Sequence, residues 1–209
     1  MDGRIATPTG HSHYINGPDG LDHLHRLRAL MDAVVIGIGT ALADDPQLTV
    51  RRVEGRNPAR VVIDPNGRLP ATARLLNKDG VRRIVIVKAD VRPDLPADVE
   101  ILPVMHADGQ IAPAAILAAL RETGLSRALI EGGANTVSRF LAANCLDRLH
   151  VVVAPIILGS GPTGLALPPI ERAGDAMKPP VHVRRLGDEV LFDCDLSAQR
   201  RGGRAKKST

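Results

Sequence analysis

Aromatic side chains are almost absent from this chain of 209 residues. It has no tryptophan, one tyrosine (Tyr14) and two phenylalanines (Phe140 and Phe192), so valine, isoleucine, leucine and alanine must fill the core. Such an aliphatic core is typical of a parallel β-sheet, whose strands are covered on both faces. The chain also has no stripe of aromatic and basic residues, so we predict no nucleic-acid partner.

Cysteine and long apolar runs are equally scarce. Cys145 and Cys194 lie far apart and neither has a close cysteine neighbour, which excludes a disulfide framework and is typical of a reduced cytosolic protein. No apolar run approaches the roughly 18 residues of a membrane helix, and the residues after Met1 do not form a signal peptide. We therefore predict a cytoplasmic protein with no membrane partner.

The net charge of +4 is concentrated at one end of the chain. Five cations follow Gln199 without any acidic residue between them, and the remainder of the chain carries a net charge of −1. This composition predicts one domain over residues 1–196 and a basic, disordered tail over residues 197–209.

Strand-like and helix-like segments alternate along most of the chain. This order predicts a mostly parallel sheet flanked by helices, with an antiparallel hairpin at one edge. The expected helices are 18–31, 113–122 and about 135–143, and the expected strands are 33–38, 59–64, 83–88, 99–104, 127–131, 150–157, 181–186 and 189–195.

Glycines follow two of the expected strands. Gly37 and Gly39 lead to Thr40, and Gly132 and Gly133 lead into a helix whose first N–H groups favour a phosphate. Each pair by itself is equally typical of a simple turn. Neither pair has the Gly-x-Gly-x-x-Gly spacing, which argues against a standard Rossmann dehydrogenase.

The loop over residues 43–51 is unusually polar for a segment that follows a buried strand. Asp44 and Asp45 either cap a turn or hold ribose hydroxyls. Arg51 closes the loop and has the forked guanidinium that binds phosphate. Arg28, in the expected helix 18–31, is a further cation that is equally open to a solvated role.

Two His-x-His pairs invite comparison with metal sites. His23 and His25 fall within an expected helix, where residues two apart point in different directions. No cysteine or carboxylate completes a ligand set with them or with His11 and His13, so we predict no metal.

Taken together, several segments resemble the reductase domain of the bifunctional riboflavin-biosynthesis deaminase/reductase family. The resemblance extends to about residue 196 and implies a dihydrofolate-reductase-like α/β fold, NADPH as cofactor and a homodimer. The implied reaction reduces the ribose of 5-amino-6-(5-phosphoribosylamino)uracil to a ribityl chain, with hydride passing to C1′ of an opened sugar. The matching segments are 2–6, 10–12, 27–28, 35–51 with its Ala-Asp-Asp-Pro core, 61–70, 131–133 and 147–159.

The resemblance also implies roles for individual residues, while the proton donor stays unassigned between Asp44 and Glu131. Substrate positions are matched by Ser12, Arg28, Leu48, Arg51 and Glu131. Cofactor positions are matched by Tyr14, Thr40, Asp44, Gly133, Ala134, Asn135, Thr136, Val137, Ser138 and Arg139.

The chain departs from the family pattern in three ways. Pro65 replaces a serine that contacts the cofactor in some relatives, and relatives carry a further strand directly before the segment that begins at Asp2. The deaminase signature, His-x-Glu with Pro-Cys-x-x-Cys, is absent. Two alternatives therefore stay open: a reductase of the 2,5-diamino-6-ribosylaminopyrimidinone phosphate or another pyrimidine- or pterin-like substrate, and a nucleotide-binding module without turnover.

Overall fold

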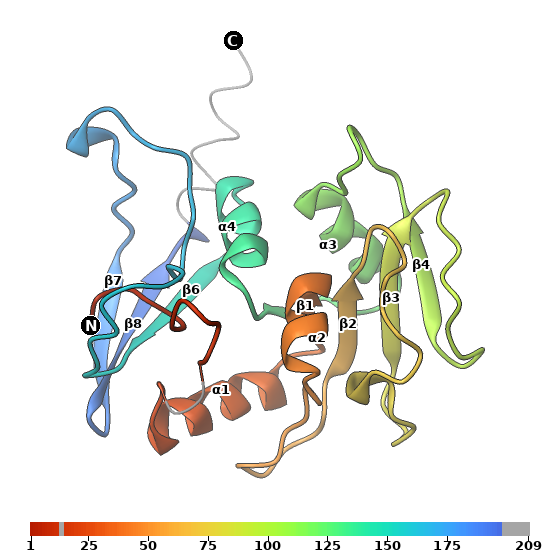
Figure 1. Cartoon of the computed structure of the whole chain (residues 1–209), viewed down its shortest axis with the longest axis horizontal. Coiled ribbons are helices and arrows are strands. Elements are labelled where there is room, and N and C mark those ends of the chain that lie inside the picture. The colour runs from red at the N-terminus through yellow and green to blue at the C-terminus, as the bar shows by residue number, and fades with distance from the viewer. Residues whose placement is uncertain (13–14, 198–209) are drawn as a thin grey trace. The chain divides into compact units, whose positions relative to one another are not determined.

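The computed structural model describes residues 1–12 and 15–197 (Figure 1). Tyr14 and nearly all of the expected tail lie outside these residues, so their assignments stay predictions. The chain divides into two compact units, each described here by itself. One unit comprises Leu24–Val137, and the other comprises Met1–His23 together with the chain from Ser138 onwards.

The Leu24–Val137 unit contains a five-stranded sheet in which all neighbouring strands are parallel, as predicted. The order is β4-β3-β2-β1-β5. The strands are β1 (Ala33–Gly37), β2 (Ala59–Ile63), β3 (Arg83–Lys88), β4 (Glu100–Val104) and β5 (Ala128–Ile130).

Both faces of this sheet are covered, which explains why its central strands are continuous aliphatic runs. The helix α2 (Ile38–Asp44) lies in front of the sheet and α3 (Pro113–Glu122) lies behind it (Figure 1). Ile38 and Ala41 of α2 and Ile116 and Leu120 of α3 are buried. The fold predicted from the aliphatic composition is confirmed.

The helix α2 corrects one prediction. The sequence suggested that the strand beginning at Ala33 continues to Ile38 and then enters a turn, but the strand ends at Gly37 and a helix begins at Ile38. The glycines suggested a turn. However, Gly37 keeps extended backbone angles, and the alanines and leucine that follow are strong helix formers.

Two buried arginines fix the short helix η1 (Arg74–Leu76) against the sheet. Arg60 donates from Nη1 to the Leu75 carbonyl oxygen (3.1 Å), and Arg83 donates from Nη1 to the Leu76 carbonyl oxygen (2.8 Å). Each guanidinium also pairs with an aspartate, Asp79 for Arg60 and Asp98 for Arg83. Buried charge is thus compensated, and the position of η1 is set by the start of β2 and β3.

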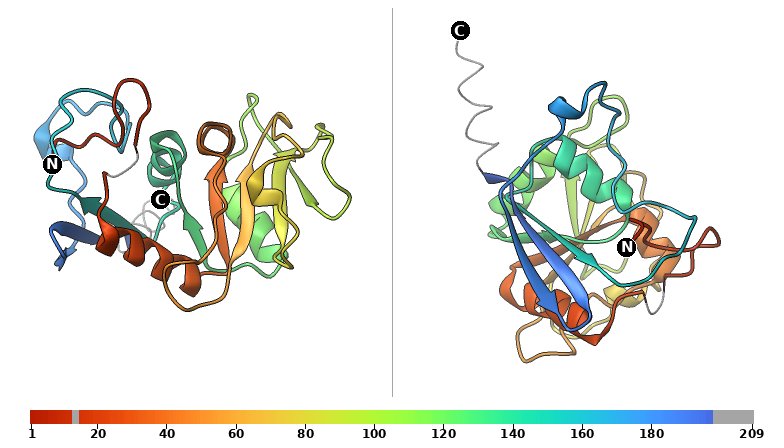
Figure 2. Two further views of the ribbon diagram at one scale, coloured as in Figure 1. Left: turned by 60° about the horizontal axis from the view of Figure 1, so that its bottom comes forward. Right: turned by 90° about the vertical axis from the view of Figure 1, so that its left-hand side faces the viewer.

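The second unit contains an antiparallel sheet in the order β6-β8-β7. The predicted hairpin of β7 (Val181–Leu186) and β8 (Glu189–Asp195) is confirmed, and the right-hand view of Figure 2 shows its two strands side by side. Its placement at an edge of the parallel sheet was wrong, because β8 pairs with β6 (Arg148–Val153) instead. β6 also ends four residues earlier than expected, just before Pro155, which has no N–H to donate to a strand partner.

Two helices contain the points where the chain passes from one unit to the other. They are α1 (Pro18–Leu30) and α4 (Ala134–Ala142), and both match the predicted helices to within one residue at each end. A single turn, η2 (Ala173–Asp175), completes the described elements. Within residues 1–12 and 15–197, none of the helices has the length and apolarity that a membrane crossing requires.

Asp32, directly before β1, makes the stability of the parallel sheet sensitive to acid. Its carboxylate accepts hydrogen bonds from the side chain and backbone of Arg127 and from the Ser126 N–H, which lowers its pKa to about 2. The group therefore stabilises the fold above pH 4 and loses that contribution as the pH falls from about 4 to 2. Urea unfolding of Asp32→Asn should show a weaker loss of stability over this range than the wild type. Asp94→Asn, an exposed control, should lose stability with falling pH as the wild type does. An equal loss of stability with pH in all three proteins would contradict the assignment.

His150 gives the antiparallel sheet a second pH dependence, at milder pH. Burial lowers its pKa, an effect that Arg148 and Arg184 reinforce and that Asp193 opposes. Since the folded chain then binds fewer protons than the unfolded chain, stability falls as the pH drops below about 6.5. In His150→Gln, the midpoint of unfolding should change less between pH 7.5 and 5.5 than it does in the wild type. The exposed control His182→Gln should keep the pH dependence of the wild type. A wild-type pH dependence in His150→Gln would refute this origin.

Candidate active site

One face of α1 anchors the polar loop that follows α2. His25 and Arg28 are three residues apart, so they lie on the same helix face, and both are buried. The Nδ1 atom of His25 accepts the backbone N–H of Arg51 (3.1 Å), and Nη1 of Arg28 donates to the Thr49 carbonyl oxygen (3.0 Å). The helix therefore fixes the loop at Thr49 and at Arg51, the predicted phosphate ligand.

Arg28 also donates hydrogen bonds to the carboxylate of Glu131. Its Nε donates to Oε2 of Glu131 (2.9 Å) and its Nη2 donates to Oε1, so the pair is bidentate. The Arg28 side chain is 7% exposed and that of Glu131 is 17% exposed. The charge of Arg28 is thus balanced inside the chain, and Glu131 is held as a carboxylate that accepts hydrogen bonds.

The ends of β1 and β5 meet closely enough that glycine is required at both. The hydroxyl of Thr40 accepts the Gly133 N–H (2.9 Å), and a Cβ atom on Gly132 would lie 2.9 Å from the same oxygen. Gly132 also has a φ of +112°, which side chains rarely adopt. A Cβ atom on Gly37 would collide with the hydroxyl of Thr136.

This glycine-lined turn leads directly into α4. The first N–H groups of a helix have no partner within the helix and attract anions. Backbone without side chains followed by a helix N-terminus is the arrangement that admits the phosphates of a dinucleotide. The residues present therefore fit the predicted cofactor.

Positive charge gathers around Arg51. Partial burial and the nearby charges of Arg28, Arg74 and Arg52 lower the pKa of the Arg51 guanidinium, and Glu131 acts in the opposite direction. An arginine stays charged despite such a shift. The local field therefore favours an anion at this point.

The remaining predicted residues have varied surroundings. Leu48 is 1% exposed and belongs to the core beside α2, despite a positive φ of 55°. Asp44 is the exposed last residue of α2. In the other unit, Ser138 is buried and its hydroxyl accepts the Ala166 N–H (2.8 Å). Along α4, Ala134, Val137 and Arg139 are partly exposed and Asn135 is exposed.

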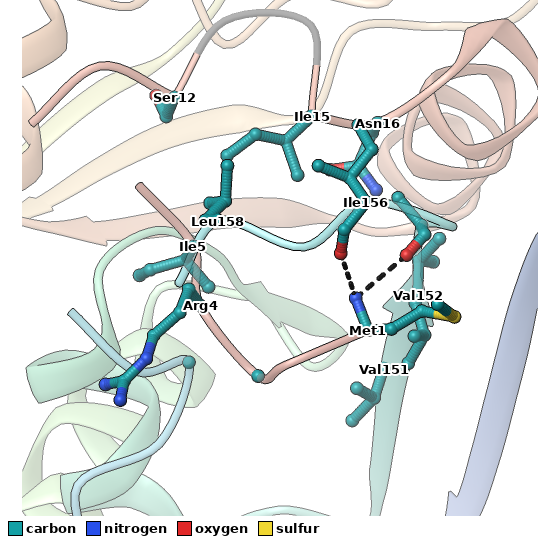
Figure 3. A pocket seen from close by; sticks show the side chains of 14 residues that line it. Met1, Arg4, Ile5, Ser12, Ile15, Asn16, Val151, Val152, Ile156 and Leu158 are labelled. Atoms are coloured by element: carbon teal, nitrogen blue, oxygen red, sulfur yellow. Dashed lines mark hydrogen bonds between the residues drawn. The ribbon is translucent and has the colours of Figure 1, made fainter. Parts of the chain in front are cut away.

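Ser12 lines a cavity of about 400 Å³ within the second unit (Figure 3). Arg4, Ser12 and Asn16 supply its polar side chains, and the rest of the wall is largely aliphatic. The amino group of Met1 donates to the carbonyl oxygens of Ala154 and Ile156 at one side. The volume is within the range of small-molecule sites, and the substrate role of Ser12 stays a prediction.

Sequence reasoning missed two residues that shape the site. His25 was considered only as a metal ligand, whereas it positions the backbone of Arg51. Asn57 was not considered, yet its Oδ1 accepts the Val50 N–H (2.6 Å). The spacing of His25 and Arg28 on one helix face was the signal available for the first; the second depends on a tertiary contact.

The Arg28–Glu131 pair predicts a distinctive stability pattern. Arg28→Met should lower the free energy of unfolding by about 3 kcal/mol, because it leaves the largely buried Glu131 carboxylate without its partner. The double variant Arg28→Met/Glu131→Leu should recover most of that loss, since no unpaired charge remains. Chemical denaturation of the two variants measures the difference. Equal stability of the single and double variants would show that the pair does not hold this part of the fold.

Comparison with known proteins identifies close relatives of this chain. The RibD C-terminal domain family model matches residues 1–192. The 2,5-diamino-6-ribosylamino-4(3H)-pyrimidinone 5′-phosphate reductases of Methanothermobacter thermautotrophicus and Archaeoglobus fulgidus are 37% and 34% identical to it. These matches cover 76% of this chain and 75% and 78% of the respective relatives. RibD of Aquifex aeolicus is 32% identical over 92% of this chain and 54% of its own length.

Solved structures give the same picture. The deaminase/5-amino-6-(5-phosphoribosylamino)uracil reductase of Thermotoga maritima superposes with a TM-score of 0.78 at 30% identity, covering 93% of this chain and 53% of that one. The riboflavin biosynthesis reductase Rib7 of Saccharomyces cerevisiae has a TM-score of 0.76 at 20% identity, with coverage of 93% and 85%, and supports the fold alone. The chain spans about half the length of the RibD proteins that it matches.

Proposed function

Because this chain belongs to the RibD C-terminal domain family, we propose that it reduces the ribose of a pyrimidine ribosyl 5′-phosphate to a ribityl chain. The prediction of an oxidoreductase of riboflavin biosynthesis with a dihydrofolate-reductase-like fold is confirmed. The observation that carries the substrate proposal is the joint anchoring of Arg51 and Glu131 by His25 and Arg28. This anchoring holds one cation and one carboxylate beside the same face of α1, which supports a phosphate and a sugar as the ligands.

In this proposal, Arg51 and Glu131 bind different parts of the substrate. Arg51 binds the phosphate, because its charge, unlike that of Arg28, has no carboxylate partner among the described residues. Glu131 accepts hydrogen bonds from sugar hydroxyls, because Arg28 orients its carboxylate. Such fixed groups position the sugar carbon for reduction without contributing covalent chemistry.

Family membership implies a nicotinamide cofactor, and we propose that this cofactor is NADPH. When bound, it supplies the hydride that C1′ of the opened sugar accepts. The N–H groups in the first turn of α4 would hold its phosphates, and Gly133, whose own N–H donates to the Thr40 hydroxyl, would leave space for them. Asp44, exposed at the end of α2, is proposed to bind a ribose hydroxyl.

Two substrates meet this description. 5-Amino-6-(5-phosphoribosylamino)uracil is the substrate named for the Thermotoga relative, and we take it as the first candidate. The 2,5-diamino-6-ribosylaminopyrimidinone phosphate is favoured by a separate observation: both archaeal relatives, which this chain matches over most of their length, carry its name.

We further propose a homodimer that acts in the cytoplasm, without a nucleic-acid partner. Val151, Phe192 and Val183 are direct neighbours across β6, β8 and β7, and they are 36%, 37% and 60% exposed. An apolar row of this kind on a sheet face is suited to a protein interface. Cys145 and Cys194 lie far apart in the sequence, as is typical of a protein from a reducing compartment.

Reduction itself is tested by following the oxidation of NADPH with each pyrimidine phosphate. We expect turnover with at least one substrate, and slower turnover with NADH, which lacks the 2′-phosphate. NADPH binding without oxidation by either substrate would replace this proposal with the nucleotide-binding module. The ratio of kcat/KM for the two substrates identifies the physiological one.

Arg51→Ala tests the phosphate assignment. Loss of one charge-assisted hydrogen bond should raise KM for the pyrimidine phosphate about tenfold or more, while the Kd of NADPH stays unchanged. Arg121→Ala, which removes an exposed cation from the last turn of α3, serves as the control. Equal loss of substrate and cofactor affinity in Arg51→Ala would refute the assignment.

A further inference from the structure

Arg74 is an exposed residue held in place by buried neighbours. Ala73, Leu75 and Leu76 are buried in the core beside α2, and the carbonyl groups of Leu75 and Leu76 accept hydrogen bonds from Arg60 and Arg83. The backbone of η1 therefore has little freedom. The Arg74 side chain is exposed to solvent, although its backbone is held in place.

The same short helix is joined to the loop that carries Arg51. Oδ1 of Asp45, the residue that ends α2, accepts the backbone N–H of Arg74 (2.8 Å). Leu48, three residues further along the loop, is buried in the same core cluster as Leu75. One hydrogen bond and a shared apolar core thus join η1 to this loop.

The charges of Arg51 and Arg74 are not balanced by carboxylates, in contrast to those of three other arginines in this unit. Arg28, Arg60 and Arg83 each pair with a carboxylate, but among residues 1–12 and 15–197 no ion pair engages the guanidinium of Arg51 or Arg74. The two cations are close enough for Arg74 to lower the pKa of Arg51. Oδ1 of the Asp45 carboxylate accepts the backbone N–H of Arg74.

The Arg51 guanidinium donates one long hydrogen bond, from Nη1 to the Thr49 hydroxyl (3.4 Å), and neither Arg51 nor Arg74 has a carboxylate partner among the described residues. Two such guanidinium groups can form a site for a doubly charged anion. A phosphate monoester carries between one and two negative charges near neutral pH and presents three acceptor oxygens. Each arginine can offer it a forked pair of donors. A single arginine would leave part of that charge uncompensated.

From this arrangement we infer that Arg74 is a second phosphate-binding residue of the substrate site, acting beside Arg51 on the 5′-phosphate of the sugar. The inference rests on the proposed function, in which Arg51 binds that phosphate. It makes the site selective for phosphorylated over unphosphorylated sugars.

The test uses D-ribose 5-phosphate as a probe, so that binding is measured without turnover. Calorimetric titration of Arg74→Ala should show about tenfold weaker binding than the wild type, the loss expected for one charge-assisted interaction. Arg74→Lys should lose less, because it keeps the charge but not the fork. D-Ribose and NADPH should bind these variants and the wild type alike, and Arg121→Ala should match the wild type throughout.

Several outcomes would overturn the inference. Ribose 5-phosphate affinity in Arg74→Ala equal to that in Arg121→Ala would show that Arg74 is only a solvated surface residue. A parallel loss of NADPH affinity, or a lowered unfolding midpoint shared by Arg74→Ala and Arg74→Lys, would assign it to the cofactor or to the fold. Failure of the wild type to bind ribose 5-phosphate would remove the phosphate site as a whole.

The result is separable from the proposed reaction. A tenfold weaker binding of ribose 5-phosphate to Arg74→Ala, in a protein that reduces neither pyrimidine phosphate, would refute the reductase proposal and uphold the role of Arg74. If Arg74→Ala instead reduces a pyrimidine phosphate with an unchanged KM, the reductase proposal is upheld and the role of Arg74 is refuted.

Discussion

The bidentate pair of Arg28 and Glu131 is the interaction on which the candidate active site depends. Burying a guanidinium or a carboxylate alone is costly, so each group requires the other, and their shared geometry fixes both. Because Arg28 also donates to the Thr49 carbonyl oxygen, the pair joins three segments that are distant in sequence: α1, the end of β5 and the loop after α2. The positions of Arg51 and of the glycine turn before α4 follow from this junction.

Arginines in the Leu24–Val137 unit differ in whether a carboxylate of the described residues pairs with them. Arg28, Arg60 and Arg83 reach backbone carbonyl groups and carboxylates, so their charges are used in holding segments together. Arg51 and Arg74 extend from segments that these residues hold, and their guanidinium groups remain available to a ligand. The structural arginines therefore determine the positions of the two arginines that we propose as phosphate ligands.

The secondary structure was largely predictable because aliphatic runs and helix caps are local signals. The runs over 59–64 and 83–88 predicted β2 and β3, and the expected helix 113–122 coincides with α3. The errors came where local signals compete. Glycines at the end of β1 suggested a turn although the alanines beyond them form α2, and the pairing of β8 with β6 depends on contacts between segments about 40 residues apart.

By itself, the sequence determined the α/β class, the run of parallel strands and the segments in which the site residues lie, since these depend on composition and short-range pattern. It also carried the family resemblance, which needs only residue identities. The tertiary structure alone decided that Arg28 is balanced by Glu131, that His25 supports Arg51 and that Arg74 lies beside the same loop. Hydrogen-bond partners are chosen by distance and direction in space, and a charged side chain reveals its role only when its neighbours are known.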